Sequence, residues 1–336
     1  MEKKYGKKAN RMDRCCQMYR YIYGLYWTFW SSCWKNATIC VWVSCSFIFF
    51  LAGCTENFQK SLSFLDGVKK KIKRLIFPWI VFVFLSLLLR VITEETSIEN
   101  IKSCIGTILK GSVRNNFFVG SLWFLTALFV ISIFFLIIKH LPKWAMLLVS
   151  FVMFLMTIPD VRNPLHVVTP PSWVFNVDSA MHYFVYYVIG FCSFFSINQL
   201  LSSENIKTKI ATLASFIFSF LFCVATFFGA NPYVKLYDIP YISIVATIPK
   251  TIIMVWFIIC LSYKLQHIEC LRNIGKQTLF LCGNEYIVSV LIPMVAGIFG
   301  LEVQFSSPMA IYLYGIFMIA IIIKILIPIE KTIFNI

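Results

Sequence analysis

Long apolar runs separated by short polar segments recur from one end of the chain to the other. An α-helix needs about 20 apolar residues to cross a bilayer, and most of these runs approach that length. The pattern therefore predicts an all-α fold, a polytopic integral membrane bundle of about ten transmembrane helices. The predicted spans are Tyr21–Trp30, Ala37–Ala52, Leu75–Ile92, Val119–Ile138, Ala145–Ile158, Met181–Ile197, Ile210–Phe228, Ile242–Tyr263, Leu279–Phe299 and Met309–Pro328.

A basic cluster in the stretch Phe47–Trp79 orients these spans. An apolar run ends near Gly53, and a polar loop then leads to Lys69, Lys70, Lys71, Lys73 and Arg74. Lysine and arginine near span ends are retained on the cytoplasmic side. Counting from this point places both termini in the cytoplasm, together with most other basic loops, and leaves residues 159–173 and 231–240 outside. We expect a single membrane domain over residues 1–336.

Composition narrows the class of protein. The chain is 59% hydrophobic and only 13% charged, with a mean hydropathy of +0.79, which excludes a water-soluble globule. The net charge of +15 would suggest nucleic acid in a soluble protein. Here the basic residues lie in short loops and in the first 14 residues, as the positive-inside rule predicts, so nucleic acid is not an expected partner. The expected partner is the lipid bilayer.

The twelve cysteines form no CxxC pair and no Cys/His metal spacing, so no metal site is expected. Most of the later ones lie within spans, where a thiol packs as a small apolar group, and structural disulfides are not expected. The start of the chain is unusual. Six cysteines lie within the first 54 residues, and four of the nine tryptophans lie between Trp27 and Trp42.

Few ionisable residues fall at membrane depth. Asp178 and His182 are four residues apart at the start of a span and would share one helix face. They are either an interfacial pair that caps the helix or part of a polar cavity, because buried ionisable groups need partners. Glu285 is expected to face the bundle interior, where it is either hydrogen-bonded structurally or lines a polar site. The other histidines, His140, His166 and His267, lie in loops and are expected to be solvated.

The basic cluster also has two interpretations. It is sufficient as a topology anchor without any ligand. Clustered ammonium and guanidinium groups are also good partners for phosphate. No P-loop, GxSxG elbow or zinc motif accompanies it.

A series of short motifs, in order, resembles a known family. They are FFLAG, KKKIKRLIFPW, SLWFLTALF, HYFVYYVIGF and IGKQTLFLCGNE. The order resembles membrane acyltransferase family 3, and within it the fucose 4-O-acetylase-like branch, over about residues 47–330. The resemblance implies a multi-pass enzyme of the bacterial cytoplasmic (inner) membrane. It would bind no resident cofactor and would move an acyl group, usually acetyl from acetyl-CoA, onto an envelope carbohydrate.

The resemblance also assigns residues by position. Lys73 and Arg74 match the family's basic motif and would bind the phosphates of acyl-CoA. Trp123 matches the tryptophan of the WFL motif, and Asn284 and Glu285 stand in the closing GNE motif. Trp123 and Asn284 would line the substrate cavity, while Asp178, His182 and Glu285 are weak candidates for catalytic groups.

The first helix departs from the family. Its WID-(V/A)-AKG-like opening and its Gly-His, which carries the presumed catalytic imidazole, are missing from residues 1–46. Reading the codons one base late restores them. Met12–Asp13 must then give Trp, the following codons permit Ile-Asp-Val-Ala-Lys, and Trp27–Thr28 forces the Gly of Gly-His. We therefore expect residues of about 8–49 to be out of frame, which also explains their excess of cysteine and tryptophan; the alternative is a genuinely divergent first helix. The chain as written is expected to be inactive or to fold its first two helices poorly.

Two alternatives remain from the sequence. A non-enzymatic glycan exporter or flippase would also have about ten spans and a basic surface, although no inverted repeat or matching pair of broken helices supports it. A family member that has lost its catalytic histidine is the second alternative.

Overall fold

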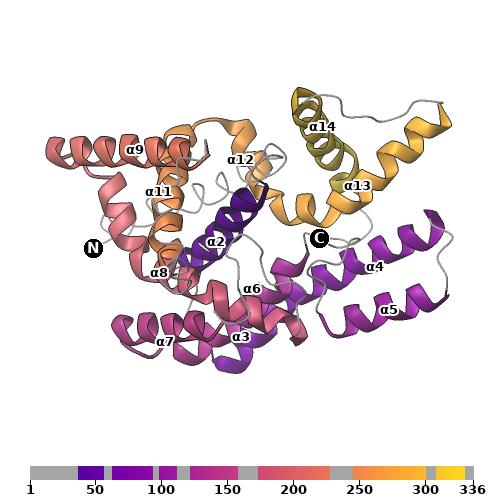
Figure 1. Cartoon of the computed structure of the whole chain (residues 1–336), viewed down its shortest axis with the longest axis horizontal. Helices are drawn as coiled ribbons and strands as arrows, with labels where there is room; N and C mark the ends of the chain where they lie inside the picture. Colours follow the sequence, from indigo (N-terminus) through magenta and orange to yellow (C-terminus); the bar gives the residue numbers. More distant parts are fainter. Residues whose placement is uncertain are drawn as a thin grey trace, which may run out of the picture. The chain divides into compact units, whose positions relative to one another are not determined.

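The described part of the chain is helical throughout. The computed structural model describes residues 37–56, 63–93, 98–111, 122–157, 173–227, 245–299 and 308–329, and no strand occurs among them. The elements, in order, are α2 (Ala37–Glu56), α3 (Phe64–Lys71), the π-helix η2 (Ile72–Ile76), α4 (Phe77–Thr93), α5 (Ile98–Leu109), α6 (Trp123–Ile138), α7 (Lys143–Met156), the 3-10 turn η4 (Val174–Asn176), α8 (Val177–Leu201), α9 (Ile206–Phe227), α11 (Thr247–Leu265), α12 (Glu269–Lys276), α13 (Thr278–Ile298), α14 (Pro308–Ile321) and the π-helix η6 (Ile322–Leu326) (Figure 1). The all-α prediction is confirmed for these residues.

Several of these helices can cross a membrane. Five are long and apolar enough, and four shorter apolar helices accompany them within the described residues. Each predicted span from Ala37 onward corresponds to one of these helices. The first predicted span, Tyr21–Trp30, lies outside the described residues, so the count of ten and the cytoplasmic termini stay predictions. The chain is a multi-pass membrane protein.

The basic cluster is helical, contrary to the predicted loop. The helix begins after Ser63, whose Oγ accepts a hydrogen bond from the amide of Asp66 and donates one to its Oδ2 at 2.6 Å. This side-chain cap satisfies an otherwise unpaired donor of the first turn. Helical structure then runs without a break from Phe64 to Ile92. The basic residues therefore stand on the same helical rod as the membrane span that follows them.

Each π-helix ends two residues before a proline. The amide of Phe77 bonds back to the carbonyl of Ile72, and the next residue is Pro78; likewise the amide of Ile327 bonds to Ile322 before Pro328. Proline has no amide hydrogen, and its ring crowds the carbonyl four residues earlier. Widening the preceding turn relieves that crowding and lets the helix continue. This explains why the span beginning at Phe64 can carry a proline in its interior.

A helix lies between the predicted spans Leu75–Ile92 and Val119–Ile138. Residues Ile98–Leu109 form α5, which the apolar pattern did not predict because it is short and mixed in polarity. Ile105 and Leu109 are exposed on it. Arg90 at the end of α4 points its Nη1 to within 3.9 Å of the Cys104 sulfur.

Two compact units can be distinguished. The first contains residues up to 61, 141–167 and 182–276, and the second contains 62–140, 168–181 and 277–336. In the first unit, α2 packs on α8 and α11, and α11 packs on α9. In the second, α4 packs on α13, and α6 contacts α3 and η2. The single membrane domain over residues 1–336 stays a prediction.

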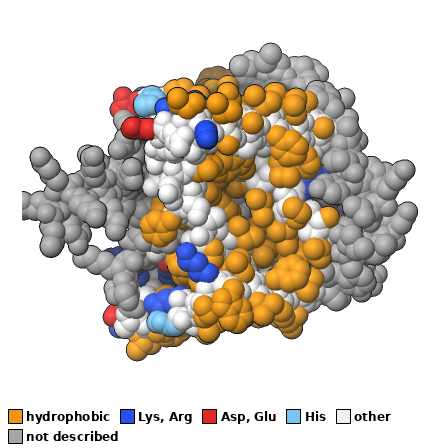
Figure 2. Space-filling view, turned by 90° about the vertical axis from the view of Figure 1, so that its left-hand side faces the viewer, with side chains coloured by type: hydrophobic (Ala, Val, Ile, Leu, Met, Phe, Trp, Pro, Cys, Tyr) orange, Lys and Arg blue, Asp and Glu red, His pale blue; other side chains and the backbone are white. Residues whose placement is uncertain are grey.

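The surface is that of a protein that faces lipid. Figure 2 shows a face on which hydrophobic side chains predominate and charged ones are few. The span Ile206–Thr226 is the extreme case, since only 6% of its most apolar window is buried within the protein. Its exposed side chains include Ile210, Leu213, Ile217 and Phe220.

Candidate functional site

A group of exposed basic residues lies on the helix that leads into the membrane. Lys69, Lys70, Lys73 and Arg74 are exposed on α3 and η2, whereas Lys71 between them is buried. Lys73 and Arg74 lie within the π-helix itself. The helix therefore presents several cations at the end of a membrane span, where a soluble anion could meet them. We call Lys69, Lys70, Lys73 and Arg74 the basic face.

A buried polar cluster lies beside the WFL motif in the second unit. Asn176 is fully buried, and its Nδ2 donates to the carbonyl of Gly111 at 3.0 Å and to Oγ1 of Thr126 at 2.6 Å. The same amide nitrogen lies 3.5 Å from the carbonyl of Trp123. Thr126 is also fully buried, and its hydroxyl donates to the Trp123 carbonyl at 2.8 Å. Asn176 thus joins the start of α6, the end of α5 and the start of α8.

The backbone at this cluster is strained. Phe175 and Asn176 have φ values of 55° and 54°, a left-handed conformation that is rare for residues other than glycine. Asparagine tolerates it better than most residues. The Phe175 amide donates to the Lys110 carbonyl at 2.8 Å, and the Phe175 ring packs on Gly111, which itself has a φ of 65°. These contacts hold the strained turn, and strain of this kind gathers at functional sites.

Asp178 is a buried carboxylate in the second unit. It is 3% exposed in the first turn of α8, and its Oδ1 accepts from the Ser179 amide at 2.8 Å. Among the described residues, Oδ2 of Asp178 and Oδ1 of Asn176 are buried without a hydrogen-bond partner. Buried acceptors of this kind are uncommon and call for a donor. The Ser179 amide is one of the otherwise unpaired donors of the first helical turn, and the two unpaired oxygens mark a polar interior. That Asp178 and His182 cap the helix as a pair stays a prediction.

His182 lies one turn after Asp178 on α8 and belongs to the first unit. It is 5% exposed, its ring lies 4.8 Å from Phe154 and 5.1 Å from Tyr183, and its Nδ1 lies 3.2 Å from Oγ1 of Thr157. The Thr157 hydroxyl donates its only hydrogen to the Phe154 carbonyl at 2.7 Å. With that hydrogen engaged, the hydroxyl accepts at the imidazole, and Nδ1 is the donor of this contact.

The GNE motif lies on α13 near its start. Asn284 is 1% exposed, and its Nδ2 donates to the Phe280 carbonyl one turn earlier at 3.0 Å, while Glu285 is half-buried. A Cβ at Gly283 would collide with the ring of Phe82 on α4. The glycine therefore sets the close packing of α13 on α4. A substrate cavity lined by Trp123 and Asn284 stays a prediction.

Some of this arrangement was not foreseen from the sequence. Asn176 and Thr157 carry polar contacts but belong to no recognisable motif. Thr126 lies within the SLWFLTALF motif but was not singled out as a site residue. The signal available in the sequence was an asparagine two residues before the Asp178 carboxylate. Within the described residues no group of three or more His, Cys, Asp or Glu side chains could hold a metal ion.

Comparison with protein families identifies a match over most of the chain. Residues 47–327 match the family Acyl_transf_3, described as an acyltransferase domain. No curated protein and no solved structure matches the chain. The matched segment covers most of the 336 residues, begins at Phe47 and includes the basic face, Trp123, the Asn176 cluster, His182 and Asn284. The chain therefore belongs to the acyltransferase 3 family of membrane proteins.

Proposed function

We propose that this protein is a membrane O-acyltransferase that transfers acetyl from acetyl-CoA to a sugar hydroxyl of an envelope polysaccharide or its precursor. The observation that carries the proposal is the unbroken helix from Phe64 to Ile92, on which the basic face leads directly into a membrane span. Acyl-CoA is soluble and polyanionic, and its acyl group must reach an acceptor at the membrane. Cations at the end of a span suit that requirement.

The basic face supports phosphate binding at the donor site. Arg74 offers a planar fork of donors that matches phosphate, and Lys73 adds a point charge beside it. Both side chains are exposed, so they can reach a soluble donor without a change in the fold. On this proposal the side of the membrane that carries the basic face is the cytoplasmic one, and in a bacterium the membrane is the inner membrane.

The reaction needs a base and an oxyanion site. A histidine takes the proton of the sugar hydroxyl, and the hydroxyl oxygen attacks the thioester carbonyl carbon. Hydrogen-bond donors stabilise the negative oxygen of the tetrahedral intermediate. The carbon–sulfur bond then breaks, the CoA thiolate takes a proton from the histidine, and the acetylated sugar leaves.

We infer that the catalytic base comes from the Gly-His that a one-base shift of the codons restores in residues 8–49. The family match begins at Phe47, close to the point where the shifted codons rejoin the written frame, which supports this inference. His182 serves a different purpose on this account. Its ring packs between aromatic side chains and its proton-bearing nitrogen is bound to Thr157, so it positions the start of α8.

Acetyl-labelled acetyl-CoA distinguishes an O-acyltransferase from a glycan exporter. Membranes that contain the chain with the shifted codons restored are incubated with acetyl-labelled acetyl-CoA, and the envelope glycan is then treated with mild alkali. An O-acyltransferase leaves label on the glycan that alkali releases as acetate. An exporter moves glycan without esterifying it, so glycan transport without releasable label would overturn the proposal.

A further inference from the structure

A cavity in the first unit, lined by none of the candidate site residues named above, has the chemistry of a lipid site. Its volume is about 640 Å³, and it lies among the end of α8, the start of α9 and the end of α11. Cavities of roughly 300–1,000 Å³ are the usual size for small-molecule sites. Its cations are Lys209 and Lys264, and we call it the Lys209–Lys264 pocket. The two lysines come from helices that lie far apart in the sequence.

The pocket is fixed in place by the antiparallel packing of α9 on α11. Trp256 donates its Nε1 hydrogen to Oγ of Ser215 at 3.0 Å, and the ring of Phe257 lies 5.4 Å from that of Phe216. The start of α9 and the end of α11 therefore lie at the same end of the pair, as the alternation of membrane spans requires. Each lysine is at a span end, where the polar headgroups of a bilayer begin.

The turn between α8 and α9 is also ordered by hydrogen bonds. The Ser203 hydroxyl accepts from the Asn205 amide at 3.3 Å, and Oδ1 of Asn205 accepts from the Lys207 amide at 2.9 Å. Asn205 thereby caps the first turn of α9. The polar edge of the pocket, which includes Ser203 and Glu204, is therefore a built feature of the fold.

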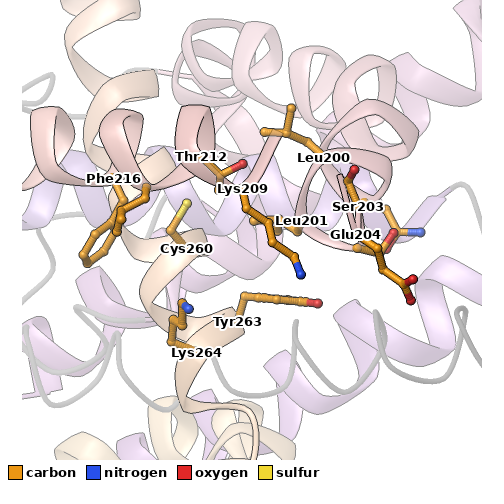
Figure 3. A pocket seen from close by; sticks show the side chains of 13 residues that line it. Leu200, Leu201, Ser203, Glu204, Lys209, Thr212, Phe216, Cys260, Tyr263 and Lys264 are labelled. Carbon is orange, nitrogen blue, oxygen red and sulfur yellow. The ribbon is translucent and has the colours of Figure 1, made fainter. Parts of the chain in front are cut away.

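The lining changes from polar to apolar along α9. Lys209 and Tyr263 point into the same space, with Lys264 beside the tyrosine, and Phe216 and Glu204 lie on opposite sides of that space (Figure 3). Leu213 and Phe216 continue the lining one to two turns farther into the span. Beyond them, α9 exposes Ile217 and Phe220 on the lipid-facing surface. A ligand that fills the pocket needs an anionic head and an apolar tail.

The charge of the lining selects among such ligands. Two lysines and one glutamate leave one net positive charge, which suits a single phosphodiester rather than a polyphosphate. Ser202, Ser203 and the Glu204 carboxylate offer hydrogen bonds to headgroup hydroxyls. Basic pockets between transmembrane helices are known to bind anionic lipid headgroups.

We propose that the Lys209–Lys264 pocket binds an anionic glycerophospholipid of the phosphatidylglycerol class. The phosphodiester contacts Lys209 and Lys264, the glycerol headgroup contacts the Glu204 edge, and one acyl chain lies along Leu213 and Phe216. The pocket lining contains no residue of the basic face, and the proposal does not depend on the acyl-transfer reaction.

The test measures lipid binding to the full chain in detergent. Phosphatidylglycerol is titrated into the delipidated protein and its binding is followed by native mass spectrometry, for the wild type and for Lys209→Gln/Lys264→Gln. Each lysine near a membrane surface contributes about 1 kcal/mol to anionic lipid binding, so the double variant should bind about 30-fold more weakly. The control is Lys143→Gln/Lys207→Gln, which removes the same charge from exposed positions outside the pocket and should change binding less than 2-fold.

Binding of other lipids and of a free phosphate ester shows whether the pocket recognises an anionic lipid or phosphate alone. Phosphatidylcholine and phosphatidylethanolamine should bind at least 10-fold more weakly than phosphatidylglycerol, and sn-glycerol 3-phosphate should not compete below millimolar concentration. Equal binding of a zwitterionic lipid, effective competition by the free phosphate, or an equal loss in the control variant would each overturn the proposal. A photoactivatable phosphatidylglycerol on the wild type tests the site without any variant: crosslinks should fall on Leu213–Phe216 or Cys260–Lys264, and crosslinks found only elsewhere would refute it.

Discussion

Gly53 on α2 and Gly190 on α8 allow the two helices to touch backbone to backbone. A Cβ added at Gly53 would collide with the carbonyl oxygen of Tyr187, and one at Gly190 would collide with that of Phe50. The Cys54 thiol donates to the Gly190 carbonyl at 3.2 Å across the same contact. Small residues permit this approach between membrane helices, where packing is the main source of stability. Both glycines belong to motifs, FFLAG and HYFVYYVIGF, that resemble the acyltransferase family.

Alanine at Gly53 or Gly190 should therefore destabilise the first unit strongly. The colliding atoms are backbone, which cannot move aside as a flexible side chain can, so each change should cost at least about 3 kcal/mol, the upper end for overpacking. The measurement is the thermal unfolding midpoint of the purified chain in detergent.

Gly106→Ala is the matched control, because no atom lies within 4 Å of a Cβ built there in α5. That change should be neutral or stabilise by about 0.5–1 kcal/mol. Equal midpoints for all three variants would show that α2 and α8 do not pack through these glycines.

The stability of the protein should depend on both the hydrogen bonds and the backbone conformation of Asn176. Asn176→Ala removes the donors to Gly111 and Thr126 and leaves a side chain at a φ of 54°. Lost buried hydrogen bonds cost about 1–3 kcal/mol, and the left-handed conformation adds about 1 kcal/mol for a residue with a Cβ. Asn176→Gly loses the hydrogen bonds but relieves the strain, so it should be the more stable of the two. Chemical denaturation of both variants measures the difference, and the reverse order would contradict the left-handed turn.

Substitutions in the basic face should weaken the binding of acetyl-CoA and not the binding of the acceptor sugar. In the chain with restored codons, Lys73→Ala/Arg74→Ala should raise the KM for acetyl-CoA by about 10-fold or more while kcat changes little, because phosphate contacts remote from the reacting carbon bind the ground state and transition state alike. Lys143→Ala/Lys207→Ala removes equal charge elsewhere and should leave the KM unchanged. A fall in kcat at constant KM would instead assign these residues to the chemistry.

Thr157→Val should test the positioning role of His182. The change removes the acceptor for the Nδ1 hydrogen and leaves a buried donor unpaired, which costs about 1–3 kcal/mol of stability. Thr157→Ser keeps the hydroxyl and should restore the unfolding midpoint. In the restored chain both variants should keep the wild-type pH profile of kcat. A profile displaced by Thr157→Val and recovered by Thr157→Ser would make His182 the base.

Much of this architecture was predictable because membrane spans appear in the sequence as long apolar runs. Runs such as Ile210–Phe228 must satisfy backbone hydrogen bonds internally, so they form helices whatever they pack against. The helical state of Lys69–Arg74 was missed, since a run of cations resembles a loop until the Ser63 cap and the π-turn before Pro78 are seen. The Asn176 cluster was missed because it depends on contacts between residues 50 and more positions apart, which no local pattern reveals.

The comparison of the written chain with the restored chain tests the central claim most directly. The two differ only in the frame of the codons for residues 8–49, and each is expressed in membranes that lack other acyltransferases and supplied with acetyl-labelled acetyl-CoA. The account predicts alkali-releasable label on the envelope glycan with the restored chain and background label with the written one. Equal label from both chains would place the catalytic base among the written residues, and no label from either would contradict the acyltransferase assignment itself.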